Sequence, residues 1–140
     1  MIKMKIRNYQ PTDKKNVISL WEEVFKPDKI HNDPKTSIEQ KTKQNDKLFF
    51  VAVEDNKIVG TIISGYDGHR GWLYSLAVSP KHRNKGIGTS LVKKAIEELK
   101  KLGCLKVNLQ INNDNKTVVD FYKKTGFIIE DRISMGKTIY

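Results

Sequence analysis

Apolar residues recur along the chain with two different periods. Over residues 2–7 they alternate with Lys or Arg, and a period of two predicts a half-buried strand. A second apolar set then repeats at intervals of three and four residues, which predicts a helix that Thr12 caps and Pro27 ends. The members of this set are Val17, Leu20, Trp21, Val24 and Phe25.

A second helix and a group of strands follow. Thr36 and Glu39 have the spacing of a capping box, which predicts a short helix over about 37–46. Three runs rich in aromatic and β-branched residues then predict strands, and the short turn between the first two predicts an antiparallel hairpin. These runs are 48–53, 58–63 and 72–78.

In the second half of the chain, helices and strands alternate. An amphipathic helix follows Gly88 and ends at Gly103, a strand is predicted over 105–111, and a short helix ends at Gly126. The apolar face of the first of these helices consists of Leu91, Ala95, Leu99 and Leu102. The final β segment and its return strand, which are expected to form a hairpin, cover 127–129 and 132–140.

The predicted order of elements is β-α-α-β-β-β-α-β-α-β(-β). An antiparallel meander followed by a strand–helix–strand crossover predicts a mixed sheet with a right-handed crossover, so the predicted fold class is α/β. The chain has 140 residues and contains no repeat, linker or low-complexity stretch. A single domain over 1–140 is therefore expected.

Charge and cysteine usage narrow the class of protein. The formal net charge of +10 favours an anionic partner such as a nucleic acid or a phosphorylated ligand, although the Lys residues are dispersed. Cys104 is the only cysteine, so it forms no disulfide within the chain, and we expect a buried small residue there and no metal site. No apolar run approaches the roughly 18 residues of a membrane span. A cytoplasmic protein that makes no membrane contact is expected.

A basic, glycine-rich segment lies between a predicted strand and a predicted helix. A helix N-terminus offers unpaired backbone N–H groups and the positive end of the helix dipole, and glycines let a ligand approach those groups closely. The segment therefore predicts a cradle for a phosphate or pyrophosphate group. It consists of Arg83, Asn84, Lys85, Gly86, Ile87, Gly88 and Thr89.

Two familiar phosphate-binding motifs do not match this segment. A P-loop requires Lys-Ser or Lys-Thr after its second glycine, and neither pair stands there. A Rossmann fingerprint requires a third small residue where this chain has Leu91, and no opening βαβ unit precedes it. A glycine-rich helix start that binds nothing remains the alternative.

Asn115 and Tyr122 form a second feature. They are seven positions apart, so they lie on roughly the same face of a short helix. An Asn in this position is also a common helix cap, and a Tyr is often a core residue. Neither residue is specific by itself.

Together, the two features resemble the GNAT superfamily of acyl-CoA N-acyltransferases. Its central motif, Gln/Arg-x-x-Gly-x-Gly/Ala after a strand, is matched by Arg83, Gly86 and Gly88. Its later motif, Asn-x-x-Ala-x-x-x-Tyr followed by Gly-Phe, is matched by Asn115, Val118 in place of Ala, Tyr122, Gly126 and Phe127. The order of elements matches along the whole chain, and residues 65–71 resemble a subgroup of small, poorly characterised bacterial members.

The resemblance implies an N-acetyltransferase with acetyl-CoA as its cosubstrate. Backbone N–H groups of 83–89 would hold the CoA pyrophosphate, and Asn115 would contact the pantetheine region. Tyr122 would lie near the thioester sulfur and act as the general acid for the leaving thiolate. The strand residues that would pair with the pantetheine arm through main-chain hydrogen bonds are Leu76, Ala77 and Val78.

The general base stays open at this point. Many relatives carry a Glu on the strand before the glycine turn, but residues 72–76 of this chain contain no carboxylate. Candidates for the base are Glu22, Asp67 and His69, and a water chain is the alternative. The ordinary pKa of His, about 6.5, suits the role of His69.

The acceptor is expected to be a small-molecule or peptide amine, bound between the first helix, the 26–36 loop and the 66–72 hairpin. Trp21, Phe25, Tyr66, Trp72 and Tyr74 are the aromatic residues that could line this acceptor pocket. A homodimer is common in the family and is neither supported nor excluded here. The alternatives to an enzyme are a catalytically silent acyl-CoA sensor and, as the least favoured, a basic nucleic-acid-binding module.

Overall fold

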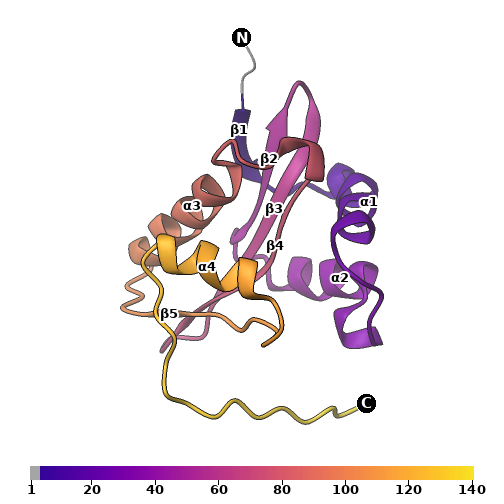
Figure 1. Cartoon of the computed structure of the whole chain (residues 1–140). Helices are drawn as coiled ribbons and strands as arrows, with labels where there is room; N and C mark the ends of the chain where they lie inside the picture. Colours follow the sequence, from indigo (N-terminus) through magenta and orange to yellow (C-terminus); the bar gives the residue numbers. More distant parts are fainter. Residues whose placement is uncertain (1–3) are drawn as a thin grey trace. The chain divides into compact units, whose positions relative to one another are not determined.

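The computed structural model describes residues 4–140, which divide into two compact units, one ending at Leu109 and the other covering Gln110–Tyr140 (Figure 1). The second unit contains a single helix, α4 (Lys116–Lys124). The strands of the first unit are β1 (Met4–Asn8), β2 (Phe49–Glu54), β3 (Lys57–Tyr66), β4 (Gly71–Val78) and β5 (Val107–Asn108). Its helices are α1 (Lys14–Val24), α2 (Pro34–Gln44) and α3 (Ile87–Lys101).

The five strands form one mixed sheet in the order β1-β2-β3-β4-β5. Neighbouring strands from β1 to β4 run antiparallel, and β5 pairs in parallel with β4. The β2–β3 hairpin turns through Asp55 and Asn56, whose φ angles of 51° and 62° are those of a type I′ turn. The predicted α/β class, mixed sheet and antiparallel hairpin are confirmed.

Helices cover both faces of this sheet in the first unit (Figure 1). Successive residues of a strand point to opposite faces. A Cβ placed on Gly60 of β3 would meet Leu91 of α3, whereas the Thr61 hydroxyl bonds to Trp21 of α1. Therefore α3 packs on one face, and α1 packs on the other with α2 beside it. The core beneath α1 and α2 consists of Val17, Leu20, Trp21, Ile38, Phe49, Val51, Ile63 and Ala77.

The start of the first helix differs from the prediction. Thr12 does not cap it, because Thr12 lies inside a 3₁₀ turn, Pro11–Asp13, and α1 begins only after Asp13. The Asp13 carboxylate is buried and accepts hydrogen bonds from the backbone N–H of Gln10 and from the Arg7 guanidinium, both at 2.8 Å. This ion pair joins the end of β1 to the start of α1.

The second helix also begins earlier than predicted. Its cap is Asp33 rather than Thr36, because the Asp33 carboxylate accepts a hydrogen bond from the backbone N–H of Thr36 at 3.1 Å. Pro34 then occupies the first helical position, where its missing N–H costs nothing. At the other end, Lys41 Nζ donates to Ser64 O of β3 at 2.6 Å and thereby ties α2 to the sheet.

The predicted strands of the C-terminal part are wrong in extent. The strand over 105–111 shrinks to β5, and Leu105 is 96% exposed. No strand forms over 127–140, where Ile128, Ile133 and Ile139 are all exposed. Alternating apolar residues specify a strand only where a neighbouring strand pairs with them and one face becomes buried.

Two predictions around the end of α3 have opposite outcomes. Cys104 is buried, as predicted. Leu102 does not belong to the buried face of α3, because the helix ends at Lys101 and the Leu102 side chain is half exposed.

Membrane-spanning and metal-binding features were searched over residues 4–140. No helix in this range is long and apolar enough to cross a membrane, and no group of three His, Cys, Asp or Glu side chains there could hold a metal ion. The single domain over 1–140 stays a prediction, because the described residues divide into two units.

Candidate active site

Strand β4 and the glycine-rich segment meet where β4 ends. After Val78, a short 3₁₀ turn, Pro80–His82, carries the chain to Arg83. The Arg83 side chain folds back, and its Nε donates to Val78 O at 3.1 Å. The structure therefore brings together two groups of predicted cofactor-binding residues, 76–78 and 83–89, within the first unit.

The backbone before α3 has the conformation of an anion cradle. Asn84 and Gly86 have φ angles of 63° and 82°, and left-handed residues next to a helix start turn successive N–H groups toward one concave side. The first N–H groups of α3 also lack intrahelical partners. The side chain of Ile87 is buried, so Ile87 offers a ligand only its backbone. A Cβ on Gly86 would have no atom within 4 Å, so the approach to the cradle is open.

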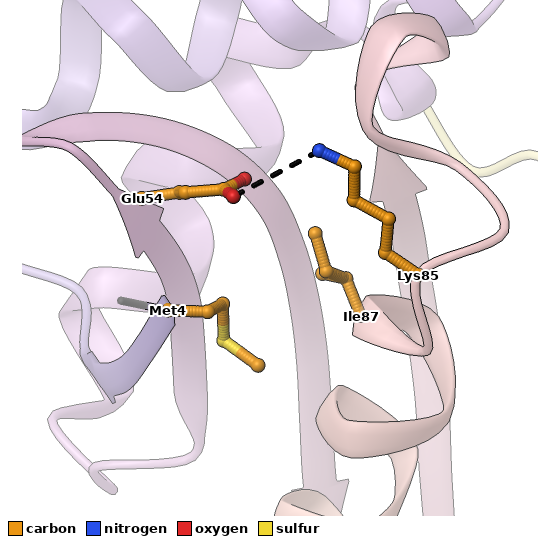
Figure 2. Close-up of a pocket in the computed structure, with 4 residues that line it drawn as sticks. All are labelled: Met4, Glu54, Lys85 and Ile87. Carbon is orange, nitrogen blue, oxygen red and sulfur yellow. Dashed lines mark ion pairs between the residues drawn. The ribbon is translucent and has the colours of Figure 1, made fainter. Parts of the chain in front are cut away.

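The buried carboxylate of Glu54 contacts the basic side chains of this segment and of the turn before it. Figure 2 shows the Glu54 side chain, at the end of β2, and the Lys85 side chain pointing toward each other beside Met4 and Ile87. Lys85 Nζ lies 3.9 Å from Glu54 Oε1, and His82 Nε2 lies 3.5 Å from Glu54 Oε2. Glu54 is only 5% exposed. Glu54 thus attaches both ends of the 82–85 stretch to the sheet and balances part of its charge.

One edge of β4 is open over most of its length. β4 pairs with β5 only at Gly71 and Trp72, and no other strand within residues 4–140 pairs with β4 on that side. The main-chain groups of 73–78 on this edge are therefore unpaired with any strand. Such an edge can bind an extended ligand as if the ligand were another strand.

A bulge lies in the middle of this open stretch. Ser75 and Leu76 of β4 together lie opposite one residue of β3, Ile62. The φ angle of Ser75 is 50°, a left-handed conformation that residues other than glycine rarely adopt. Bulges change the direction of main-chain groups and are common next to active sites.

The second unit contains the other two motif residues. Asn115 caps α4, because its side-chain oxygen accepts a hydrogen bond from the backbone N–H of Val118 at 3.4 Å. Tyr122 is buried, and its ring packs edge-on against Phe121 and Phe127, with centroid distances of 5.1 and 5.4 Å. Burial raises the pKa of Tyr122 to about 12. Its hydroxyl therefore stays protonated across the physiological range.

The raised pKa predicts a loss of stability in alkali that Tyr122→Phe removes. An unfolded Tyr ionises near pH 10, so the contribution of Tyr122 is complete below pH 10 and is lost as the pH rises toward 12. We expect the wild type to lose about 1 kcal/mol more than Tyr122→Phe between pH 9 and pH 11. Urea unfolding of both proteins at both pH values measures this difference. An equal loss would contradict the raised pKa.

The three base candidates lie in two places, one on α1 and two at the tip of a hairpin. Glu22 is on the exposed face of α1. Asp67 and His69 are at the tip of the β3–β4 hairpin, where Asp67 Oδ1 accepts the backbone N–H groups of His69 and Arg70, each at 2.7 Å. These hydrogen bonds, that from Arg70 first, hold the pKa of Asp67 below its ordinary range. Asp67 therefore stabilises the turn, and a carboxylate of low pKa is a weak base.

His69 is exposed at the same tip. The hairpin leads into Gly71 at the start of β4, whereas the bulge lies five residues further along the strand. At about 3.3 Å per residue, this separation is roughly 15 Å. The role of His69 as the base stays a prediction, as does that of Glu22.

The aromatic residues predicted for the acceptor pocket have different environments. Trp21 is buried in the core and stacks on Phe49 at 6.0 Å, so it presents almost no surface to a substrate. Phe25 and Tyr74 are 40% and 53% exposed. Of these three, only Phe25 and Tyr74 are free to contact an acceptor directly.

Sequence reasoning missed several residues that shape this region. Glu54 was predicted only as part of a turn, although it is the last residue of β2 and contacts the glycine-rich segment. Thr61 was read as one position of an apolar strand, although it is completely buried and hydrogen-bonded on both sides. A hydroxyl in the middle of an apolar strand was the available signal, because a buried polar group requires partners.

The chain resembles known proteins along nearly its whole length. The Acetyltransferase (GNAT) family matches residues 15–127. An acetyltransferase of Yersinia pseudotuberculosis is 38% identical over 138 residues, which are 97% of this chain and 96% of that protein.

Two solved structures have the same fold. An aminoglycoside N-acetyltransferase, AAC(6')-Iy, in complex with CoA superposes with a TM-score of 0.81 at 18% identity, over 99% of this chain and 96% of that one. The PaiA N-acetyltransferase of Thermoplasma acidophilum in complex with coenzyme A gives 0.79 at 22% identity, over 94% and 93%. The family match and the full-length relative confirm the resemblance drawn from the glycine turn and the Asn115–Tyr122 motif. The chain belongs to the GNAT family of acetyltransferases.

Proposed function

We propose that this protein transfers the acetyl group of acetyl-CoA to a primary amine by direct attack within a ternary complex. The observation that carries the proposal is the continuity between the open edge of β4 and the anion cradle at its end. An extended ligand that pairs with the 73–78 edge would reach the 83–89 cradle with its far end. Acetyl-CoA has this form, because an extended pantetheine arm leads to a pyrophosphate.

The residues of the cradle fit a pyrophosphate. The segment combines left-handed backbone at Asn84 and Gly86 with the free N–H groups at the start of α3. Arg83 and Lys85 are exposed and add positive charge. We assign the main-chain contacts to the pyrophosphate to 83–89 and the pantetheine contacts to 76–78 and Asn115.

The acceptor must lose a proton before it attacks. A Lys-like amine has an ordinary pKa of about 10.4, so roughly one molecule in 10³ is neutral at pH 7. Bound acetyl-CoA supplies a thioester carbonyl as the electrophile. The amine nitrogen bonds to the acetyl carbon while the carbon–sulfur bond breaks, and holding both reactants together contributes several kcal/mol.

Two groups of the protein act on the charges that develop. A main-chain N–H of β4 donates to the carbonyl oxygen as that oxygen becomes negative. The Tyr122 hydroxyl, which stays protonated because burial raises its pKa to about 12, gives its proton to the sulfur as the carbon–sulfur bond breaks. Glu22, His69 or a water chain accepts the proton from the amine.

The homodimer and the cytoplasmic location stay predictions.

A calorimetric titration with acetyl-CoA tests the cofactor site. The wild type is expected to bind in the micromolar range, and Gly86→Asp is expected to bind roughly 100-fold more weakly, because its carboxylate would stand beside the pyrophosphate. Gly86→Asn is the matched control, since Asn and Asp tolerate the left-handed backbone alike. Gly103→Asp repeats the same change at the other end of α3, where φ is 90° and no atom lies within 4 Å.

The titration has three distinguishable outcomes. If Gly86→Asp weakens binding while Gly86→Asn and Gly103→Asp do so much less, the glycine turn holds the pyrophosphate. If Asp and Asn bind equally well, the phosphate group lies elsewhere. If the folded wild type does not bind acetyl-CoA at all, the proposed function fails. A panel of small amines and peptides with acetyl-CoA then identifies the acceptor class.

A further inference from the structure

The bulge of β4 is held by a chain of hydrogen bonds that crosses the core. Trp21 Nε1 of α1 donates to Thr61 Oγ1 of β3 at 2.7 Å. Thr61 Oγ1 in turn donates to Ser75 O of β4 at 3.0 Å. Trp21 is 2% exposed and Thr61 is not exposed at all. The Thr61 hydroxyl thus both accepts and donates a hydrogen bond, which fixes the direction of its proton.

The chain of hydrogen bonds holds a strained residue in place. The left-handed φ of Ser75 costs of order 1 kcal/mol or more and persists only when its surroundings enforce it. The hydroxyl of Thr61 provides this restraint, because it bonds to the carbonyl of Ser75 itself. Backbone strain of this kind is concentrated at active sites and ligand-binding sites, where main-chain groups need a defined direction.

The direction of the next N–H group follows from peptide geometry. A trans peptide unit is planar, so the N–H of Leu76 points opposite to the C=O of Ser75. The Ser75 carbonyl points toward Thr61, on the β3 side of β4. The N–H of Leu76 therefore points away from β3 and from the face that α1 covers, on the side of β4 where the edge is open.

We propose that Thr61 and Trp21 are positioning residues that aim the Leu76 N–H at the thioester oxygen. This inference rests on the proposed function, and it narrows the oxyanion donor from the 76–78 stretch to Leu76. Neither Thr61 nor Trp21 touches the substrate. Their effect passes through the Ser75–Leu76 peptide plane, whose orientation the Thr61 hydroxyl determines.

Thr61→Val tests the proposal with nearly unchanged side-chain volume. Removing an oxyanion donor costs roughly 10²–10³ in kcat, so a misdirected donor is expected to cost roughly 10–100-fold, with acetyl-CoA affinity nearly unchanged. Thr61→Ser keeps the hydroxyl and should retain most of the activity. Trp21→Phe removes only the first donor and should lower kcat less than Thr61→Val does.

Ser64→Ala is the matched control in the same strand. Ser64 is equally buried, and its hydroxyl donates to Leu48 O at 2.8 Å, away from the bulge. It should lose similar stability while keeping kcat. If Thr61→Val and Ser64→Ala have the same kcat, the positioning role is overturned.

An NMR measurement decides the question without turnover. In Thr61→Val, the three-bond coupling between the amide and α protons of Ser75 should rise toward the value of an extended strand, because the left-handed φ is no longer enforced. The coupling should stay unchanged in Ser64→Ala and Thr61→Ser. An unchanged coupling in Thr61→Val overturns the inference even if the amine acceptor is unknown. Absence of acetyl-CoA binding by the wild type would instead overturn the proposed function.

Discussion

Replacing Tyr122 by Phe is expected to lower kcat by roughly 10²–10⁴-fold, the usual contribution of a general acid. The substitution removes one hydroxyl and keeps the ring that packs on Phe121 and Phe127. Without the phenol, the leaving thiolate must take its proton from water. The affinity for acetyl-CoA should barely change, because the lost interaction develops only as the carbon–sulfur bond breaks. Steady-state kinetics and a calorimetric titration measure the two quantities.

Tyr9→Phe is the control for this substitution. Tyr9 is partly buried in the first unit and stacks on Phe49 of the core with a centroid distance of 4.4 Å. Its loss of a hydroxyl should leave kcat unchanged. A Tyr122→Phe protein with wild-type kcat would exclude Tyr122 as the acid. A wild type that binds acetyl-CoA but acetylates no amine would favour the acyl-CoA sensor.

Gly60→Ala is expected to destabilise the protein by roughly 1–3 kcal/mol, the usual cost of overpacking a core. The added Cβ would lie 2.9 Å from Leu91 Cδ1 and 3.2 Å from Ile87 Cγ2, both on α3, and 3.1 Å from Ala77 O. To relieve these contacts, the buried Leu91 and Ile87 side chains must shift, and the first turn of α3 is expected to move with them. This turn carries the anion cradle, so acetyl-CoA affinity should fall as well. Urea unfolding and calorimetry measure the two effects.

Gly65→Ala makes the same change five residues further along β3. A Cβ there would meet only Lys41 Nζ, at 3.8 Å, which is an ordinary contact. Stability should therefore be unchanged or slightly higher, because alanine restricts the unfolded chain. Equal urea midpoints for Gly60→Ala and Gly65→Ala would show that α3 is not packed as tightly on β3 as the structure places it.

The helices and the three central strands were predicted well, whereas the helix starts and the C-terminal strands were not. Strands β2, β3 and β4 were predicted from runs rich in aromatic and β-branched residues, and the pairing of β2 with β3 was predicted from a short turn. The cap at Asp33 was missed because Thr36 and Glu39 offered a competing pattern, and the choice between two caps depends on where Pro34 starts the helix. The apolar residues of 127–140 suggested a hairpin that does not form, since burial depends on a partner that a local pattern does not contain.

The sequence alone predicted an anion cradle and a resemblance to the GNAT family, and the family match confirms the resemblance. An anion cradle requires only a helix start, glycines and a few basic residues, all within 83–89, so its physics is local. The glycines of this segment were predicted to let a ligand approach the backbone, and the structure adds that Gly86 has a left-handed backbone, which glycine adopts without cost.

Only the tertiary structure determined the direction of the Ser75–Leu76 peptide group in the strand beside this cradle. Trp21 and Thr61 are 40 positions apart, and Thr61 and Ser75 are 14 apart. Sheet register and helix packing bring these groups within hydrogen-bond distance, and no local pattern encodes the contact. Ser75 carries no sequence signal of a left-handed conformation, because serine normally avoids it and adopts it here through the Thr61 hydroxyl. Local backbone chemistry can be read along the chain, whereas the direction of a peptide group depends on partners that folding brings together.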